Sequence, residues 1–211
     1  MAPRLRAFEP DTATKNCKQR DKWLCMVTQG DIPLESAHIF PPSLEKWHKN
    51  YTHSEDFWCT LRMFWSSERV DSWQRATIGG TERCSNLISL TSHVRNLWDM
   101  AVFGLRPVKM SSDQKSLTVQ FYWLQPSSYC PRISMKSRPK FPADLQDAPE
   151  NARICDCGTA KPVSSGDTMT FQTDDTDKHP LPSPELLDMQ WVLHRLLALS
   201  GARDHPGTHL L

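Results

Sequence analysis

Alternation of apolar and polar residues is clearest over residues 116–124. Every second residue there is apolar, and the residues between them are polar or amphipathic. The apolar positions are Leu117, Val119, Phe121 and Trp123. This period of two predicts a half-buried antiparallel strand. Residues 102–105 predict a shorter strand before it, and residues 110–113 are typical of the turn of a hairpin that joins the two.

Helical spacing marks a second group of segments. Over residues 54–66 the apolar positions recur at helical intervals, which predicts an amphipathic helix. Residues 183–185 (Ser-Pro-Glu) are typical of a helix start, and apolar residues continue at helical spacing to residue 200. This stripe predicts a packing face, and we expect His194 to flank it rather than to bind a ligand. Shorter helices are predicted over residues 43–50, 69–76 and 92–100.

Short apolar runs and polar stretches divide the rest of the chain. Runs that end at turn residues predict strands over residues 23–28, 34–40, 87–90 and 169–172. Residues 125–166 are rich in Pro, Ser and acids, which predicts a long loop or partly disordered linker. The expected organisation is an extended lead-in at 1–21, a domain at 22–124, the linker at 125–166, a strand–helix element at 167–203 that completes the domain, and a tail at 204–211.

Composition limits the kind of core this chain can form. Its 211 residues include 16 Pro, 8 Gly and 8 Trp, which predicts short elements and a core that depends on aromatic side chains. No apolar run has the length of a membrane span, and the first residues lack the apolar region of a secretory signal. We therefore expect no membrane partner and an intracellular location, nuclear or cytoplasmic. The seven Cys form no C-x-x-C pair, which disfavours a zinc ribbon and a disulfide framework, and Cys155 and Cys157 are expected to be free thiols.

Charge is distributed unevenly along the chain. Residues 1–140 contain 20 Lys and Arg against 13 Asp and Glu, whereas residues 141–190 contain 3 against 10. A basic body with an acidic segment fits a nucleic-acid surface beside a competing strip. Ordinary surface charge gives the same totals, and no dense Lys/Arg cluster is present. Charge alone leaves both interpretations open.

One set of residues carries candidate chemistry. A predicted strand ends near His38, Asn86 precedes a second strand, and the helix that follows carries His93, Arg95 and Asp99. A neutral imidazole can take a proton from water that attacks a phosphodiester, and a divalent ion held by carboxylate, amide or imidazole groups can stabilise the leaving oxygen. Each residue also has an ordinary structural explanation: a packed histidine, a turn asparagine and a solvated histidine in the first turn of a helix.

The residues around this set resemble a known family. Residues 25–28 (CMVT), 35–41 (ESAHIFP) and 84–90 (CSNLISL) are similar to the HNH-endonuclease-type domain of a large group of fungal proteins. The similarity continues at residues 103–108, 117–124, 165–168 and 180–202. The resemblance implies an α+β fold with an HNH-like ββα-metal core, added helices at 43–76, an antiparallel strand pair and a C-terminal helix packed back on the core.

The resemblance also implies an activity and a site. The activity is metal-dependent phosphodiester hydrolysis in nucleic acid, DNA in preference to RNA, with Mg²⁺ or a similar divalent ion as cofactor. His38 matches the general base of the family and Asn86 its central asparagine, which either binds the metal or orders the loop. Asn86, Asp99, His93 and Glu35 are the candidate metal ligands. The oligomeric state is left open.

Two residues depart from the family pattern. The family has a histidine four residues before the acid or amide of a Trp/Phe-Asp/Asn pair, and this chain has Arg95 four residues before Asp99. Ala37 stands beside the base, where many such nucleases have a polar residue. A cation in place of a ligand repels a divalent ion, and Arg95 can instead pair with Asp99 one helical turn away. A catalytically degenerate HNH fold that binds nucleic acid or a protein is therefore the alternative function, and a protein-interaction surface rich in Trp is a third hypothesis.

Overall fold

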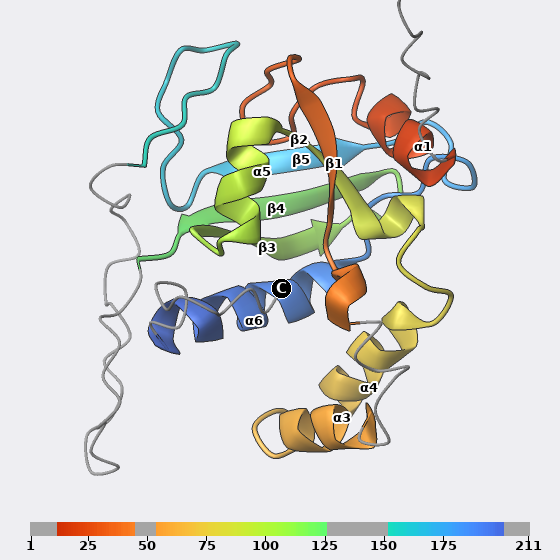
Figure 1. The fold of residues 1–211 in the computed structure, drawn as a ribbon. Helices are drawn as coiled ribbons and strands as arrows, with labels where there is room; N and C mark the ends of the chain where they lie inside the picture. Colours follow the sequence, from red (N-terminus) through yellow and green to blue (C-terminus); the bar gives the residue numbers. More distant parts are fainter. Residues whose placement is uncertain (1–11, 45–53, 126–151, 201–211) are drawn as a thin grey trace, which may run out of the picture.

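Two antiparallel sheets form the centre of the protein (Figure 1). The computed structural model describes residues 12–44, 54–125 and 152–200. The strands are β1 Leu34–His38, β2 Leu87–Thr91, β3 Phe103–Met110, β4 Ser116–Trp123 and β5 Thr168–Gln172. The smaller sheet pairs β1 with β2, and the larger sheet has the order β3-β4-β5. The helices described next complete an α+β architecture, as the sequence predicts.

Helices lie around both sheets. They are α1 Thr12–Arg20, α3 Ser54–Arg62, α4 Ser67–Thr77, α5 Ser92–Asp99 and α6 Pro184–Ser200, with a short 3₁₀ turn, η1, at Cys84–Asn86. Helix α5 follows β2 directly and contacts both β1 and β2, which completes a ββα unit. Helix α6 lies along β3, while α3 and α4 form a pair at the lower end of the view in Figure 1. Within the described residues, no helix has both the length and the apolar character needed to cross a membrane.

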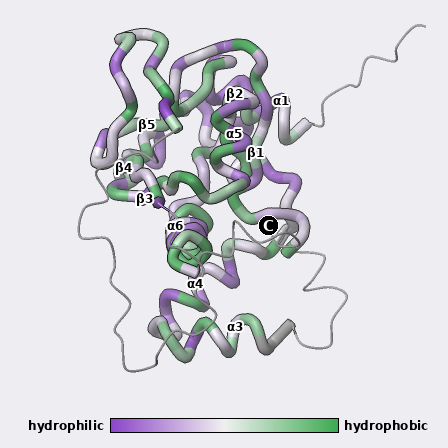
Figure 2. Tube along the Cα trace, turned by 60° about the vertical axis from the view of Figure 1, so that its left-hand side comes forward, coloured by the Kyte–Doolittle hydropathy of each residue, from purple (hydrophilic) through white to green (hydrophobic). Residues whose placement is uncertain are grey.

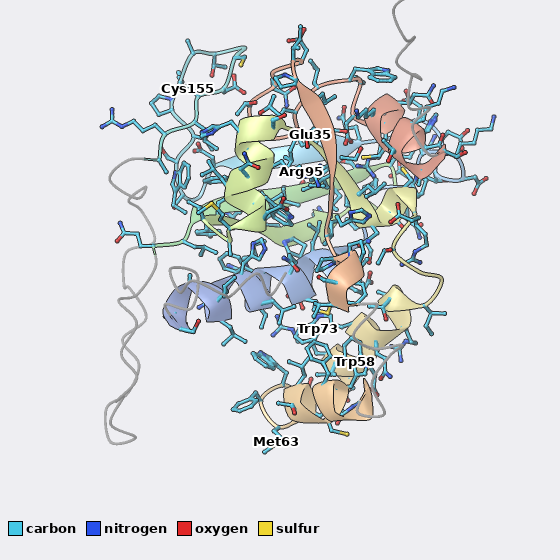
Figure 3. The ribbon with its side chains drawn as sticks, in the orientation of Figure 1. Glu35, Trp58, Met63, Trp73, Arg95 and Cys155 are labelled. Atoms are coloured by element: carbon cyan, nitrogen blue, oxygen red, sulfur yellow. The ribbon has the colours of Figure 1, made fainter. Side chains whose placement is uncertain are left out.

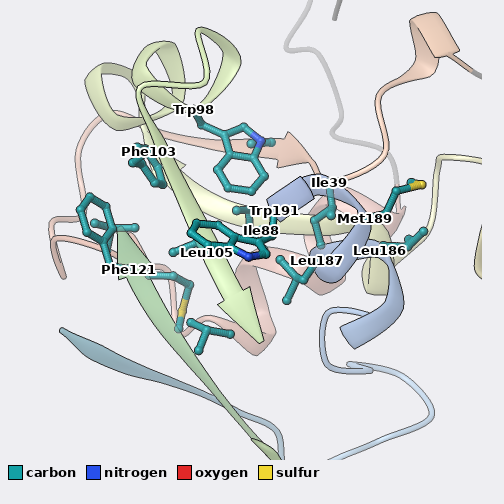
Figure 4. Close-up of a cluster of buried hydrophobic side chains, with 14 of the residues drawn as sticks. Ile39, Ile88, Trp98, Phe103, Leu105, Phe121, Leu186, Leu187, Met189 and Trp191 are labelled. Carbon is teal, nitrogen blue, oxygen red and sulfur yellow. The ribbon is translucent and has the colours of Figure 1, made fainter. Parts of the chain in front are cut away.

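Large apolar side chains fill the space between the two sheets and α6. Figure 2 shows β3, β4 and β5 on one side and β1, β2 and α5 on the other. The alternation predicted for residues 116–124 is confirmed, because the four apolar side chains of β4 are at most 1% exposed. Side chains from α5, β3 and α6 meet at Trp98, Phe103 and Trp191 (Figure 4), which are 2%, 0% and 8% exposed. The core is therefore aromatic, as the composition indicates.

Most predicted elements are present with shifted ends. The helices predicted over 54–66, 69–76, 92–100 and 183–200 are α3, α4, α5 and α6, and the strand predicted over 169–172 is β5. Strand β3 is longer than predicted and the turn of its hairpin lies at residues 111–115, where Ser111 and Asp113 accept hydrogen bonds from the backbone N–H groups of Ser116 and Lys115. The helix predicted over 43–50 lies mostly outside the described residues. So do most of the predicted linker and the predicted tail at 204–211.

Two predictions near the N-terminus are wrong. The extended lead-in is helical over residues 12–20, as α1, and the strand predicted over 23–28 is a pair of turns. The last residue of helix α1, Arg20, is 4% exposed and reaches other parts of the fold. Its guanidinium donates to the carbonyls of Leu87 at 2.7 Å, Cys84 at 2.9 Å and Pro180 at 3.0 Å, and it pairs with Asp21. Helix α1 is thus held by the hydrogen bonds of Arg20 together with a small apolar cluster, in which Ala13 and Cys17 pack with Cys84 and Leu87.

His194 also differs from its prediction. It lies in the core with 1% exposure instead of flanking the apolar face of α6. Its Nδ1 donates to the carbonyl of Phe103 at 2.9 Å, and its Nε2 accepts a hydrogen bond from the side chain of Gln190. The ring centroid is 4.6 Å from that of Trp98 in an edge arrangement. Burial lowers the pKa of His194 to about 4, so the ring is neutral in the folded protein at physiological pH.

The cysteines of the described residues are all free thiols. Cys155 and Cys157 are free, as predicted, and they are exposed in the segment that precedes β5. Cys17 and Cys84 are buried beside Arg20, and desolvation raises the pKa of Cys17 to about 12. A thiol of that pKa stays protonated and behaves as a small apolar side chain.

Candidate functional site

The ββα unit brings the candidate residues to the junction of β1 and α5. In antiparallel β1 and β2, Glu35 lies opposite Leu90 and His38 opposite Leu87. Helix α5 packs across the pair, and the indole Nε1 of Trp98 donates to the carbonyl of His38 at 3.1 Å. This bond fixes the end of β1 against the helix. The position of His38 is therefore set by both neighbouring elements.

Asn86 holds the loop that follows His38. Its side chain is buried, and its Oδ1 accepts from the backbone N–H of Phe40 at 2.8 Å. Its Nδ2 donates to the carbonyls of Phe40 at 2.9 Å and Thr81 at 3.0 Å, and its own carbonyl accepts from the N–H of Ile39 at 2.8 Å. The oxygen and the nitrogen of the side-chain amide are thus both directed at the backbone. Asn86 orders the loop in this arrangement.

Arg95 stands at the centre of a charged cluster on the face of α5 toward β1 (Figure 3). Its Nη1 donates to Oε2 of Glu35 at 2.6 Å, and its Nε lies 3.5 Å from Oδ2 of Asp99. The hydroxyl of Ser92 donates to the other oxygen of Glu35. The sequence predicts the contact with Asp99, one turn along the helix, and that contact is present. The closer partner is Glu35, which the family resemblance suggests as a metal ligand.

The two carboxylates of this cluster respond in opposite ways to their surroundings. The hydrogen bonds from Ser92 and Arg95, together with the charge of Arg95, lower the pKa of Glu35. Burial raises the pKa of Asp99, and the charges of Arg95 and His38 act in the other direction. The hydrogen bond from Trp98, the neighbour of Asp99, to the carbonyl of His38 brings the end of β1 next to this cluster. The side chains are 35% to 52% exposed, so each ion pair contributes about 1 kcal/mol at most.

His38 has a partner that the sequence did not indicate. Its Nε2 lies 2.9 Å from Oε1 of Glu82, in the loop between α4 and η1. Because an ionised carboxylate only accepts, Nε2 carries the proton, and the lone pair of a neutral ring is on Nδ1. Thr81 also donates to the same Glu82 oxygen, at 3.2 Å. The ring is thereby oriented, and its free nitrogen could accept a proton.

His93 and Ala37 lie apart from this chemistry. His93 is exposed on α5 and, within the described part of the chain, makes no hydrogen bond or ion pair. Ala37 is fully buried and offers only a methyl group toward the core. The structure therefore brings Glu35, Arg95 and Asp99 together near His38, and it leaves His93 out.

This donor set does not fit a divalent ion. A guanidinium is permanently charged and engages both Glu35 and Asp99, and the remaining oxygen of Glu35 accepts from Ser92. The amide oxygen of Asn86 is used by the backbone of Phe40. Among the residues that the structure describes, no three His, Cys, Asp or Glu side chains are grouped so that they could hold a metal. A metal would have to displace Arg95 before it could bind here.

The segment that contains the ββα unit also matches a known protein family. Residues 25–106 match the HNH endonuclease family. This match supports an HNH-type domain in that part of the chain, from the turn before β1 into β3. It includes His38, Asn86, Arg95 and Asp99. A search of the curated proteins gave no match, and a search of the solved structures gave none.

The match stops short of part of the resemblance seen in the sequence. It ends within β3, so the similarity noted at residues 117–124, 165–168 and 180–202 stays a prediction, as does the fungal group. The HNH-type domain nevertheless depends on these later segments, because α6 packs on β3 and its His194 contacts Trp98 of α5. Two residues that contact the candidate site, Glu82 beside His38 and Ser92 beside Glu35, belong to no sequence motif. Only the short separation of Glu82 from Asn86 in the sequence could have indicated Glu82.

Proposed function

We propose that this chain carries an HNH-type domain that binds nucleic acid, DNA in preference to RNA, without metal-dependent cleavage. The observation that carries the proposal is the Arg95 guanidinium in contact with both Glu35 and Asp99. The family match supports the nucleic-acid partner, and the excess of Lys and Arg over Asp and Glu in residues 1–140 agrees with it.

The chemistry of the donor set is the reason to separate binding from cleavage. Hydrolysis by this kind of domain needs a divalent ion that polarises the phosphate and stabilises the leaving oxygen. Arg95 engages both Glu35 and Asp99, the carboxylates that would have to hold such an ion, and cannot lose its proton in the protein. In our proposal Asn86 keeps its position as the residue that orders the loop after His38, so the scaffold of the site persists while its metal ligands do not.

Metal-dependent endonuclease activity is the second candidate. It is favoured by one observation, the pairing of His38 with Glu82, which leaves Nδ1 of an oriented ring as a proton acceptor. A general base of this kind suits the activation of water. Cleavage would then require Arg95 to leave Glu35 and Asp99 when substrate and metal bind.

A cleavage and binding assay with four proteins separates the candidates. Supercoiled plasmid is incubated with the wild type, Arg95→His, His38→Ala and Arg62→His across Mg²⁺, Mn²⁺, Ni²⁺ and Zn²⁺. Arg62→His is the matched control, because Arg62 pairs with Asp71 in a comparable exposed ion pair on α3 and α4. Calorimetry measures metal binding by each protein, and a gel shift measures retention of DNA.

We expect the wild type to shift DNA and leave the plasmid intact. We expect Arg95→His to gain metal binding, because it removes the cation and adds an imidazole beside Glu35 and Asp99. The control should gain nothing. Nicking by the wild type that disappears in His38→Ala would overturn the proposal in favour of the endonuclease. A wild type that neither nicks nor shifts DNA would refute both candidates.

A further inference from the structure

We propose that the open face of the β3-β4-β5 sheet binds the phosphate backbone of the nucleic acid, on the side of the protein away from Arg95. The inference rests on the proposed function and specifies which surface performs it. The charged cluster at Arg95 is a poor anchor for phosphate, because Glu35 and Asp99 both pair with its guanidinium and Glu82 pairs with His38 of the same site. An anionic ligand needs a surface without that repulsion.

The alternation of the sheet creates this surface. One face carries the buried side chains Leu105, Leu117, Val119, Phe121 and Phe171. The residues between them form the other face, and its end at Gly104 and Tyr122 packs against Trp191 of α6. We call the remainder the open sheet face, and it comprises Arg106, Lys109, Thr118, Gln120, Thr168 and Thr170. Figure 2 places this sheet on the opposite side of the core from β1 and α5. The open sheet face and the Arg95 cluster are therefore separate surfaces.

A β-bulge puts two cations on the same face. Arg106 lies opposite Gln120 and Pro107 opposite Val119, but the register then shifts, so that Lys109 lies opposite Thr118. Directly opposed residues of antiparallel strands share a face, and Gln120 and Thr118 are both on the open one. In a regular strand with no bulge, Val108 would lie opposite Thr118 and Lys109 would share a face with Pro107, toward the core. The bulge re-aims a lysine toward solvent beside Arg106, as bulges do at binding surfaces.

Charge and hydrogen-bonding groups on this face suit a phosphate chain. Strands β3, β4 and β5 contain no Asp or Glu. Arg106 and Lys109 are exposed, and neither forms an ion pair within the described residues. The hydroxyls of Thr118 and Thr170 and the amide of Gln120 lie on the same face and can donate to phosphate oxygens.

Helix α6 extends the cationic row. Arg195 stacks on Trp191, with its Cζ 5.1 Å from the ring centroid, and Trp191 in turn contacts Tyr122 of β4 at 5.1 Å between ring centroids. Gly104 is two residues before Arg106 on the same face of β3, and it lies against the ring of Trp191, so Arg106 and Arg195 flank the same indole. Burial lowers the pKa of Arg195, and the charge of Arg106 acts in the same direction. Two like charges held near each other repel, and an anion between them relieves that repulsion. Lys109, Arg106 and Arg195 together form the row that we assign to phosphate contacts.

The test compares two triple variants by fluorescence anisotropy with a short labelled DNA duplex over a range of salt concentrations. The first is Arg106→Gln/Lys109→Gln/Arg195→Gln. The double variant Arg106→Gln/Lys109→Gln keeps the contact of Arg195 with Trp191, so it separates the loss of charge from the loss of that contact. The second is the control Lys15→Gln/Arg75→Gln/Lys178→Gln, which removes the same charge from exposed residues elsewhere. Circular dichroism and thermal melting confirm that each variant is folded.

We expect the first triple variant to bind at least about 10-fold more weakly near physiological salt, and its plot of log K against log salt to flatten by about 0.9 for each phosphate that the protein no longer neutralises. The double variant should show part of the effect, and the control should retain most of the binding. If the wild type binds DNA and the first triple variant binds equally well with the same slope, the surface is wrong while the proposed function stands. If the wild type does not bind at all, both fail. If a polyglutamate peptide competes as well as unlabelled DNA, the partner is an acidic protein and the inference is overturned.

Discussion

His194 should make the stability of this protein fall as the solution is acidified. In the folded protein burial lowers the pKa of this ring to about 4, against an ordinary value of 6.5. Between these two pH values the unfolded chain binds a proton that the folded core excludes, so acid favours unfolding. The contribution is fully present above about pH 6.5 and is lost as the pH falls toward about 4, at about 1.4 kcal/mol per pH unit. From about pH 7 to about pH 5 the loss is about 2 kcal/mol.

Urea denaturation at a series of pH values measures this effect. Other groups also titrate in this range, so the informative quantity is the difference between the wild type and His194→Gln, which cannot take up the proton. His93→Gln serves as the control, because His93 is exposed and can be solvated in both states. We expect the free energy of unfolding of His194→Gln to be lower at neutral pH and to decline less steeply with acid. Parallel profiles for the wild type and His194→Gln would refute the assignment of His194 as the buried group that excludes a proton.

Three further substitutions test the packing around the site, each by urea denaturation. Gly104→Ala should lower the free energy of unfolding by about 1–3 kcal/mol, because its new Cβ would lie 2.7 Å from Cε3 of Trp191. An unchanged free energy of unfolding would show that α6 can shift away from β3. Asn86→Ala should lower the free energy of unfolding by about 2–3 kcal/mol, because the buried N–H and carbonyl of Phe40 lose their partners. For the same reason, the amide hydrogen of Phe40 should exchange faster with solvent. An unchanged exchange rate would contradict the role of Asn86 in ordering the loop. Arg20→Met should lower the free energy of unfolding by about 3–5 kcal/mol, because it leaves the buried carboxylate of Asp21 without its ion-pair partner. A stability equal to that of the wild type would show that α1 does not depend on this ion pair.

Elements with an apolar period could be predicted from the sequence, and elements held by polar contacts could not. Strand β4 and helix α6 repeat apolar residues at intervals of two and of three to four, so their buried faces follow from the order of residues alone. Helix α1 buries only Ala13, Cys17 and Arg20, and the hydrogen bonds of Arg20 join it to carbonyls 64 to 160 residues away. No local pattern reports such distant partners. His194 illustrates the same limit, because its partner Phe103 is 91 residues away.

The candidate site divides in the same way. His38, Asn86, Arg95 and Asp99 are found by motif, because each occupies a fixed place relative to a strand or a helix. Glu82, which orients His38, belongs to a loop whose path depends on the hydrogen bonds of Asn86. Glu35 meets Arg95 across 60 residues, which requires knowing how α5 packs on β1. The sequence places Arg95 four residues before Asp99 on a predicted helix, and only the fold shows that it also engages Glu35.

The contacts of α6 mean that the matched segment is not a separable unit. Residues 25–106 end within β3, yet Phe103 packs on Phe121 of β4, and Trp98 packs on His194 of α6. A fragment cut at these boundaries would lose the pairing partner of β3 and expose aromatic side chains that are at most 2% exposed in the whole chain. Such a fragment inserted into another protein would carry His38 and Asn86 but lack β4 and α6, on which its aromatic side chains pack. Chimeras and truncations of this chain should therefore keep α6 together with the segment that carries His38.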